Sequence, residues 1–101
     1  MRLAALLILL GAAGCTQRAE HTIKIEGMNF VPPTLTVNAG DLVIWQNNDL
    51  VPHTAVAAPR FDSGPIAPEG NFKVTLSQPG EIQYVCTIHP GMAGRITVQS
   101  R

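Results

Sequence analysis

Three side chains that can each bind a metal follow one another at intervals of three residues: Cys86, His89 and Met92. They come at the end of an apolar, alternating run, residues 81–86, which predicts a strand. A thiol, an imidazole and a thioether at a strand end and in the loop that leaves it converge on one ion only if a rigid scaffold holds them. This stretch therefore constrains the fold more than any other.

The types of donor indicate which metal is bound. A soft thiolate, imidazole and a weak axial thioether are the ligands of a blue copper electron-transfer site, which also needs a second histidine. His53 is the candidate, because His21 lies ahead of the first expected strand and is interpreted as a solvated residue. A lone methionine or cysteine is usually core packing. Together and at this spacing, His53, Cys86, His89 and Met92 predict one mononuclear copper site.

Length and charge exclude other classes of protein. With 101 residues the chain has room for one domain, which we expect to be a monomer. Charged residues make up 14% of it and the formal net charge is zero, so the basic surface that nucleic-acid binding requires is missing.

The rest of the chain reads as short strands separated by turns. It shows no repeat and no helical periodicity of useful length, and eight prolines and nine glycines interrupt it. Seven runs are expected to be strands: residues 22–26, 34–37, 42–47, 54–58, 71–76, 81–86 and 95–99. The turn at residues 38–41 fits either a hairpin or a corner where the chain changes sheets. We therefore expect an all-β fold, a small Greek-key sandwich or barrel of about seven short strands.

Alternation within these runs also predicts the core. The large apolar residues expected to face inward are Phe30, Val37, Val43, Trp45, Val74, Leu76, Tyr84, Ile96 and Val98.

Residues 1–14 have the features of a secretory signal. Arg2 is followed by an apolar run, residues 3–10, and then by small residues, and the run is too short to span a bilayer. The small residues precede Cys15, in a pattern that resembles the lipobox of bacterial lipoproteins, although Ala12 stands where leucine is usual. Residues 1–14 are therefore expected to be a signal peptide of the lipoprotein type.

Cys15 is expected to carry a lipid. The alternatives are an ordinary signal peptide or a disulfide to Cys86, which would consume the best metal ligand. Residues 15–21 would then be a short lipidated tether of at most roughly 25 Å, and residues 22–101 the folded domain. The protein would be exported, periplasmic or extracytoplasmic, and anchored to a membrane.

Three segments resemble the cupredoxins, the small blue copper proteins, and within them the plastocyanin and amicyanin branch. They are FVPPTLTV at residues 30–37, GDLVIWQNND at 40–49 leading to PHT at 52–54, and CTIHPGM at 86–92. The resemblance extends over residues 28–99. It implies a cupredoxin fold in which His53, Cys86 and His89 bind copper strongly and Met92 is the long axial ligand.

The resemblance also implies details of the loop. Two residues between His89 and Met92 match the short loop of amicyanin, whereas Ile88, Gly91 and Thr54 depart from the family pattern and leave the hydrogen bonds around the ligands open. In this family the loop histidine reaches the surface, so redox partners are expected to dock near His89. The apolar patch there would comprise Met28, Pro52, Pro68, Pro90 and Gly91.

The expected function is electron transfer, with copper cycling between Cu(II) and Cu(I) for redox partners at or near a membrane surface. Copper storage or delivery is the alternative. A copper enzyme such as a nitrite reductase would need a second site with more histidines, and only His21 is left. A thiol hydrolase that used Cys86 and His89 would need an elbow motif, which is missing.

Overall fold

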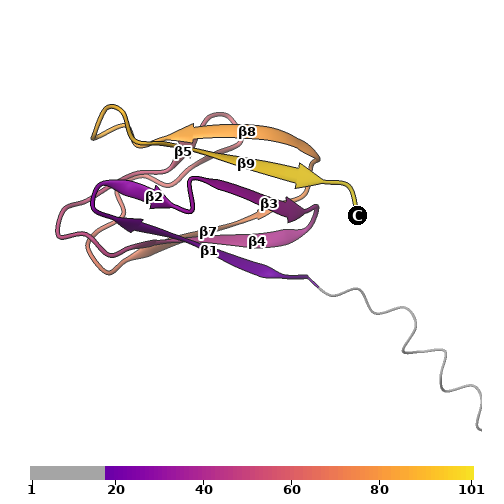
Figure 1. Cartoon of the computed structure of the whole chain (residues 1–101), viewed down its shortest axis with the longest axis horizontal. Helices are drawn as coiled ribbons and strands as arrows, with labels where there is room; N and C mark the ends of the chain where they lie inside the picture. Colours follow the sequence, from indigo (N-terminus) through magenta and orange to yellow (C-terminus); the bar gives the residue numbers. More distant parts are fainter. Residues whose placement is uncertain (1–17) are drawn as a thin grey trace, which may run out of the picture.

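The structure, a computed structural model, describes residues 18–101 and shows two β-sheets packed face to face (Figure 1). No helix occurs in this part of the chain. Its nine strands are β1 (Glu20–Glu26), β2 (Asn29–Val31), β3 (Thr34–Asn38), β4 (Asp41–Asn47), β5 (Val56–Ala57), β6 (Phe61–Asp62), β7 (Asn71–Leu76), β8 (Gly80–Val85) and β9 (Ala93–Gln99).

One sheet has the order β2-β1-β4-β7 and the other β3-β9-β8-β5-β6. The β1–β4 and β3–β9 pairs are parallel, and the other pairs are antiparallel. The predicted all-β fold is confirmed. The expected number of about seven strands was too low, because β2 and β6 have three and two residues, too few to show an alternating pattern.

The turn between β3 and β4 is a corner between sheets, not a hairpin. The two strands belong to different sheets, and the turn amides bond to other strands: Ala39 N–H donates to the carbonyl of Gln99 and Gly40 N–H to that of Leu76. Gly40 has a φ of +97°, which a residue with a side chain rarely adopts. The corner thus ties β9 and β7 together at this end of the sandwich.

The core lies between the sheets and follows the alternation of the strands. Val43 and Trp45 of β4 are fully buried, and Trp45 contacts the rings of Tyr84, Phe61 and Phe72. Eight of the nine predicted core residues are buried, and the ninth, Val74, is partly buried. The sequence analysis did not include Ile23, Ile25, Ala55, Phe61, Ile66 and Ile82 in the core.

His21 is not a solvated residue of a tether. Strand β1 begins at Glu20, two residues before the predicted start, because Ala19 and His21 both bond to the buried carboxylate of Asp41. His21 Nε2 lies 2.9 Å from Asp41 Oδ2, and the Ala19 amide donates to Oδ1 at 3.1 Å. Arg101 also bonds to Asp41, at 3.1 Å.

The predicted signal peptide and the predicted lipidation site Cys15 lie outside the described residues. Within residues 18–101, no helix has the length and hydropathy needed to cross a membrane.

Asp41 makes the stability of the fold depend on pH in the acidic range. Hydrogen bonds from the Asn38 amide, His21 and the Ala19 amide, with the nearby charge of Arg101, outweigh burial and lower the pKa of Asp41 from 3.8 to about 2. A lowered pKa stabilises the folded state above pH 3.8, and this contribution is lost as the pH falls towards about 2.

We therefore expect Asp41→Asn to lower the melting temperature at neutral pH. The difference from the parent protein should shrink as the pH falls from 3.8 towards about 2, because the parent carboxylate then becomes protonated. Thermal unfolding monitored by circular dichroism over this range tests the prediction. A difference independent of pH would contradict it.

Candidate metal centre

The structure brings the side chains of His53, Cys86 and His89 together at one end of the sandwich. The Sγ atom of Cys86 lies 3.8 Å from Nδ1 of His53 and 3.8 Å from Nδ1 of His89. One ligand atom from each residue falls within 4.8 Å of the other two. His53 follows β4 of one sheet, whereas Cys86 and His89 lie in the loop between β8 and β9 of the other.

These distances fit a single metal ion. Metal bonds of roughly 2.3 Å to sulfur and roughly 2.0 Å to imidazole nitrogen, as in zinc sites, would separate the sulfur and each nitrogen by roughly 3.7 Å in a trigonal arrangement. Two imidazoles and one thiolate with a weak axial methionine are the ligands of a blue copper site. The donors already occupy the positions that trigonal coordination requires.

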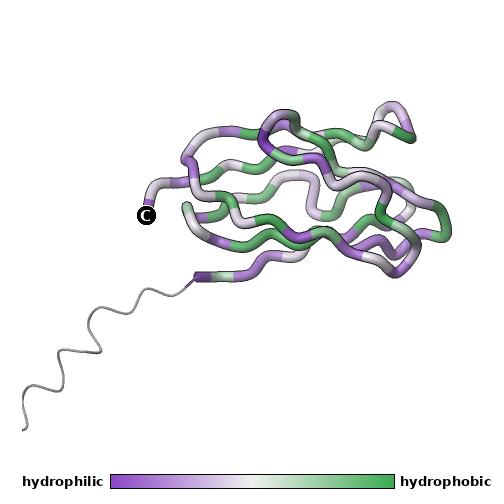
Figure 2. The backbone as a smooth tube through the Cα atoms, turned by 180° about the vertical axis from the view of Figure 1, so that it is seen from behind, coloured by the Kyte–Doolittle hydropathy of each residue, from purple (hydrophilic) through white to green (hydrophobic). Residues whose placement is uncertain are grey.

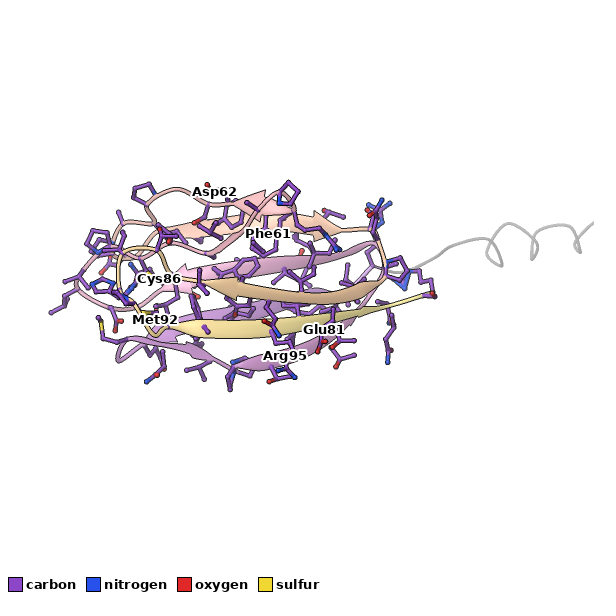
Figure 3. The ribbon with its side chains drawn as sticks, turned by 90° about the horizontal axis from the view of Figure 1, so that it is seen from above. Phe61, Asp62, Glu81, Cys86, Met92 and Arg95 are labelled. Carbon is purple, nitrogen blue, oxygen red and sulfur yellow. The ribbon has the colours of Figure 1, made fainter. Side chains whose placement is uncertain are left out.

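Met92 lies at the end of the same short loop. The Cys86 N–H donates to the carbonyl of Met92 at 3.1 Å, and the Met92 N–H donates to that of His89 at 3.3 Å. Figure 3 shows Cys86 and Met92 at the same end of the sandwich. His53, Cys86 and Met92 are 0%, 3% and 6% exposed, and only His89 is partly open to solvent. His89 is therefore the one residue of the four that a partner can approach.

The backbone of His53 is held by Ile66 and Asn47. His53 and Ile66 exchange both backbone hydrogen bonds, at 3.2 and 2.7 Å. The fully buried amide group of Asn47 donates to the carbonyls of Val51 and Ile66, both at 2.9 Å, and its oxygen accepts from the Asp49 N–H at 2.9 Å. Since every polar atom of this side chain has a partner, Asn47 fixes the path of the chain from β4 to His53.

Thr54 connects the two loops that supply the ligands. Its N–H donates to the sulfur of Cys86 at 3.4 Å, and its hydroxyl oxygen accepts from the Thr87 N–H at 2.7 Å. The two threonine hydroxyls are also 2.9 Å apart. The sequence did not indicate which residue makes the hydrogen bonds around the ligands. In the structure, Thr54 makes them.

The surroundings of Cys86 favour the thiolate. Burial raises the pKa of this thiol, but the Thr54 amide, the two imidazoles and the His89 backbone amide outweigh it and lower the pKa from 9.0 to about 6. A thiolate is the form of cysteine that binds metals.

Sequence reasoning did not identify Asn47, Asp49 or Thr87 as residues that support the ligands. Asn47 stood at the end of an expected strand and Asp49 in a segment that carried the resemblance, whereas the partners of both lie in the backbone or far along the chain. No local pattern in the sequence indicated these hydrogen bonds.

Exposed apolar residues lie in the loops that carry the ligands and in the β1–β2 turn, which bonds to Asp49. The predicted patch residues Met28, Pro52, Pro68, Pro90 and Gly91 are all exposed. Leu50, Val51 and Ile88, which the sequence analysis omitted, are 93%, 40% and 44% exposed. Hydrophobic stretches are visible on the loops at the end opposite the C-terminus (Figure 2). We call Met28, Leu50, Val51, Ile88 and Pro90 the apolar rim.

Removing the Thr54 hydroxyl should loosen the connection between the loops. In Thr54→Val the Thr87 N–H loses its acceptor, and we expect a loss of about 1 kcal/mol in the free energy of unfolding. Thr54→Ser keeps the hydroxyl and is the matched control. Urea unfolding of the metal-free proteins measures both, and equal stability of the two variants would contradict this role of the hydroxyl.

Comparisons with known proteins agree with this geometry. A family model described as copper binding proteins of the plastocyanin/azurin family matches residues 17–99. Amicyanin-alpha of Methylorubrum extorquens is 29% identical, over 87% of this chain and 84% of that protein.

Solved structures give the same result. An amicyanin variant in the Cu(I) form superposes with a TM-score of 0.74 at 28% identity, covering 87% of this chain and 89% of that one. A copper-containing nitrite reductase from Thermus scotoductus superposes with a TM-score of 0.77 at 26% identity, but this chain spans only 24% of the enzyme.

Proposed function

This chain belongs to the plastocyanin/azurin family of copper-binding proteins, and we propose that it carries single electrons through one copper ion held by His53, Cys86, His89 and Met92. The observation that carries the proposal is the triangle of Cys86 Sγ and two imidazole Nδ1 atoms, with sides of 3.8 Å from the sulfur to each nitrogen. Copper bound there supplies a one-electron couple between Cu(II) and Cu(I).

The protein's own part in the reaction is to keep the ligands still. His53 is held by two backbone bonds to Ile66, and the Cys86 loop is closed by the bond from Cys86 N–H to the Met92 carbonyl. Ligands that do not move between oxidation states let an electron transfer without a large rearrangement. Electrons would enter and leave through the ring of His89, the ligand that is partly open to solvent.

Burial of the ligands favours electron transfer over copper storage or delivery. A delivery protein has to release its metal to a partner, which requires ligands that the partner can reach. Here His53, Cys86 and Met92 are nearly inaccessible. Electron transfer needs only a short path to the surface, which His89 provides.

A second, catalytic copper site has no ligands in residues 18–101. Among these residues, His53, Cys86 and His89 form the only group of three or more His, Cys, Asp or Glu side chains that could hold a metal. His21 is partly buried and bonds to the buried carboxylate of Asp41, so it belongs to the Asp41 cluster and not to this group. The similarity to amicyanin and plastocyanin, which are electron carriers, supports electron transfer over an enzymatic role.

The apolar rim is the surface on which a redox partner would dock. Its residues belong to the β1–β2 turn, the loop after β4 and the β8–β9 loop, which lie at the same end of the sandwich (Figure 1), and Leu50 is almost fully exposed. An apolar surface with few charges forms a contact that buries the partly exposed histidine, which shortens the path for the electron.

A visible spectrum tests the copper site. The protein loaded with Cu(II) should show an intense blue thiolate-to-copper band, and Cys86→Ser should abolish that band because the thiolate is lost. Cys15→Ser, the matched control, should remain blue. A colourless parent protein, or a blue Cys86→Ser variant, would contradict the proposal.

We further propose that Cys15 is lipidated and anchors the exported protein to a membrane. The described chain begins at the end of the sandwich that carries the C-terminus, and the β8–β9 loop lies at the other end (Figure 1). An anchor at Cys15 would therefore attach the sandwich by the end away from His89. The metal centre would face away from the membrane, towards partners that reach it from the aqueous side.

Cys15→Ala should convert the membrane-bound protein to a soluble one. Expression of the full chain in a bacterial host, followed by separation of membrane and soluble fractions, measures the change, and Cys86→Ser is the control that should stay in the membrane fraction. Equal distribution of the parent and Cys15→Ala would contradict lipidation.

A further inference from the structure

The carboxylate of Asp49 accepts two backbone N–H groups and lies within hydrogen-bond distance of a histidine ring nitrogen. The Gly27 amide donates to Oδ1 at 2.7 Å, and the Met28 amide donates to Oδ2 at 2.9 Å. Nε2 of His53 lies 2.9 Å from the same Oδ2 atom. Asp49 therefore joins the turn between β1 and β2 to a buried imidazole whose other nitrogen faces Cys86.

The turn is shaped to receive a carboxylate. Gly27 and Met28 form a two-residue connection between the paired residues Glu26 and Asn29, with φ values of +58° and +65°. Positive φ at both positions is the type I′ geometry, which methionine adopts at a conformational cost. Two successive amides that point to one side form an anion-binding concavity. Here that concavity holds the Asp49 carboxylate.

Both oxygens of the Asp49 carboxylate accept backbone N–H groups, as the carboxylate form does. Burial raises the pKa of Asp49, but hydrogen bonds from the Met28 and Gly27 amides and from His53 outweigh it, and the net pKa is lowered. The side chain is only 15% exposed, so water screens the charge weakly. Because a carboxylate has no proton to donate, the hydrogen of the bond to His53 sits on Nε2.

We propose that Asp49 is a positioning residue of the metal centre: it holds His53 with the proton on Nε2 and Nδ1 free for the metal, and it increases electron donation by the ring. This proposal rests on the proposed copper site. A carboxylate bonded to the far nitrogen of a ligand histidine fixes the ring and raises its basicity. The more basic ligand favours Cu(II) over Cu(I), so Asp49 lowers the reduction potential.

Asp49→Asn keeps the shape of the side chain and removes its charge. We expect Cu(II) affinity to fall about tenfold relative to Cu(I) affinity, which raises the reduction potential by about 59 mV for a one-electron couple. The matched control is Glu26→Gln, which removes a charge at the same end of the molecule without a contact to His53. Cyclic voltammetry of the copper-loaded proteins at one fixed pH measures both.

A larger rise in the reduction potential for Asp49→Asn than for Glu26→Gln supports the proposal. Equal shifts, or no shift, would overturn it, because the effect would then be a general one of surface charge. If Asp49 had only a structural role, Asp49→Asn would lower the free energy of unfolding and leave the reduction potential of the folded protein unaltered.

Proton–nitrogen NMR of the metal-free parent protein gives an independent readout. We expect His53 to be the Nε2–H tautomer, and Asp49→Ala to give a mixture of tautomers. An Nδ1–H tautomer in the parent would overturn the proposal even if no Asp49 variant folds. Failure of the parent protein to bind copper as a blue site would instead refute the proposed function and leave the tautomer result to decide the role of Asp49.

Discussion

The metal centre depends on one contact between two loops, that of Thr54 with Cys86 and Thr87. His53 is carried by the sheet that contains β4, and the other ligands by the sheet that contains β8 and β9. At the other end the β3–β4 corner joins the two sheets by backbone hydrogen bonds, and between the ends the sheets meet through apolar side chains, which do not direct orientation. The hydrogen bonds of Thr54 are directional, so they set the position of one loop against the other and hold the sulfur near both imidazoles. Packing brings the sheets together, and this contact aligns the donors.

Each end of the sandwich contains one carboxylate that accepts backbone N–H groups, and the two carboxylates have different partners. At least one of the N–H groups at each end comes from a residue more than twenty positions away from the carboxylate, which is Asp41 at one end and Asp49 at the other. Asp41 is buried and pairs with His21 and Arg101, so its charge serves stability. Asp49 pairs with His53, so its charge also reaches the metal ligand. Stability and ligand tuning are thus served by separate carboxylates at opposite ends.

The sequence predicted what depends on local pattern. The spacing from Cys86 to Met92 and the alternation in β4 and β9 correctly identified the ligand loop and most of the core, because strand geometry relates neighbouring residues directly. The sequence could not predict what depends on partners across the fold. His21 was assigned to solvent because its partner, Asp41, is twenty residues away, and Asp49 was overlooked because its amide donors lie in a turn twenty-one and twenty-two residues earlier.

The departures from the family pattern in the ligand loop have a physical reason. Gly91 has a φ of +98°, a conformation that a residue with a side chain rarely adopts, so glycine there allows the tight return to Met92. Ile88 is 44% exposed and belongs to the apolar rim. Gly91 has no side chain, and the Ile88 side chain makes no hydrogen bond, whereas the backbone of the loop is closed by the bond from the Cys86 N–H to the Met92 carbonyl. A change at position 88 would therefore alter the exposed surface next to His89 in the chain while the donors stay in place.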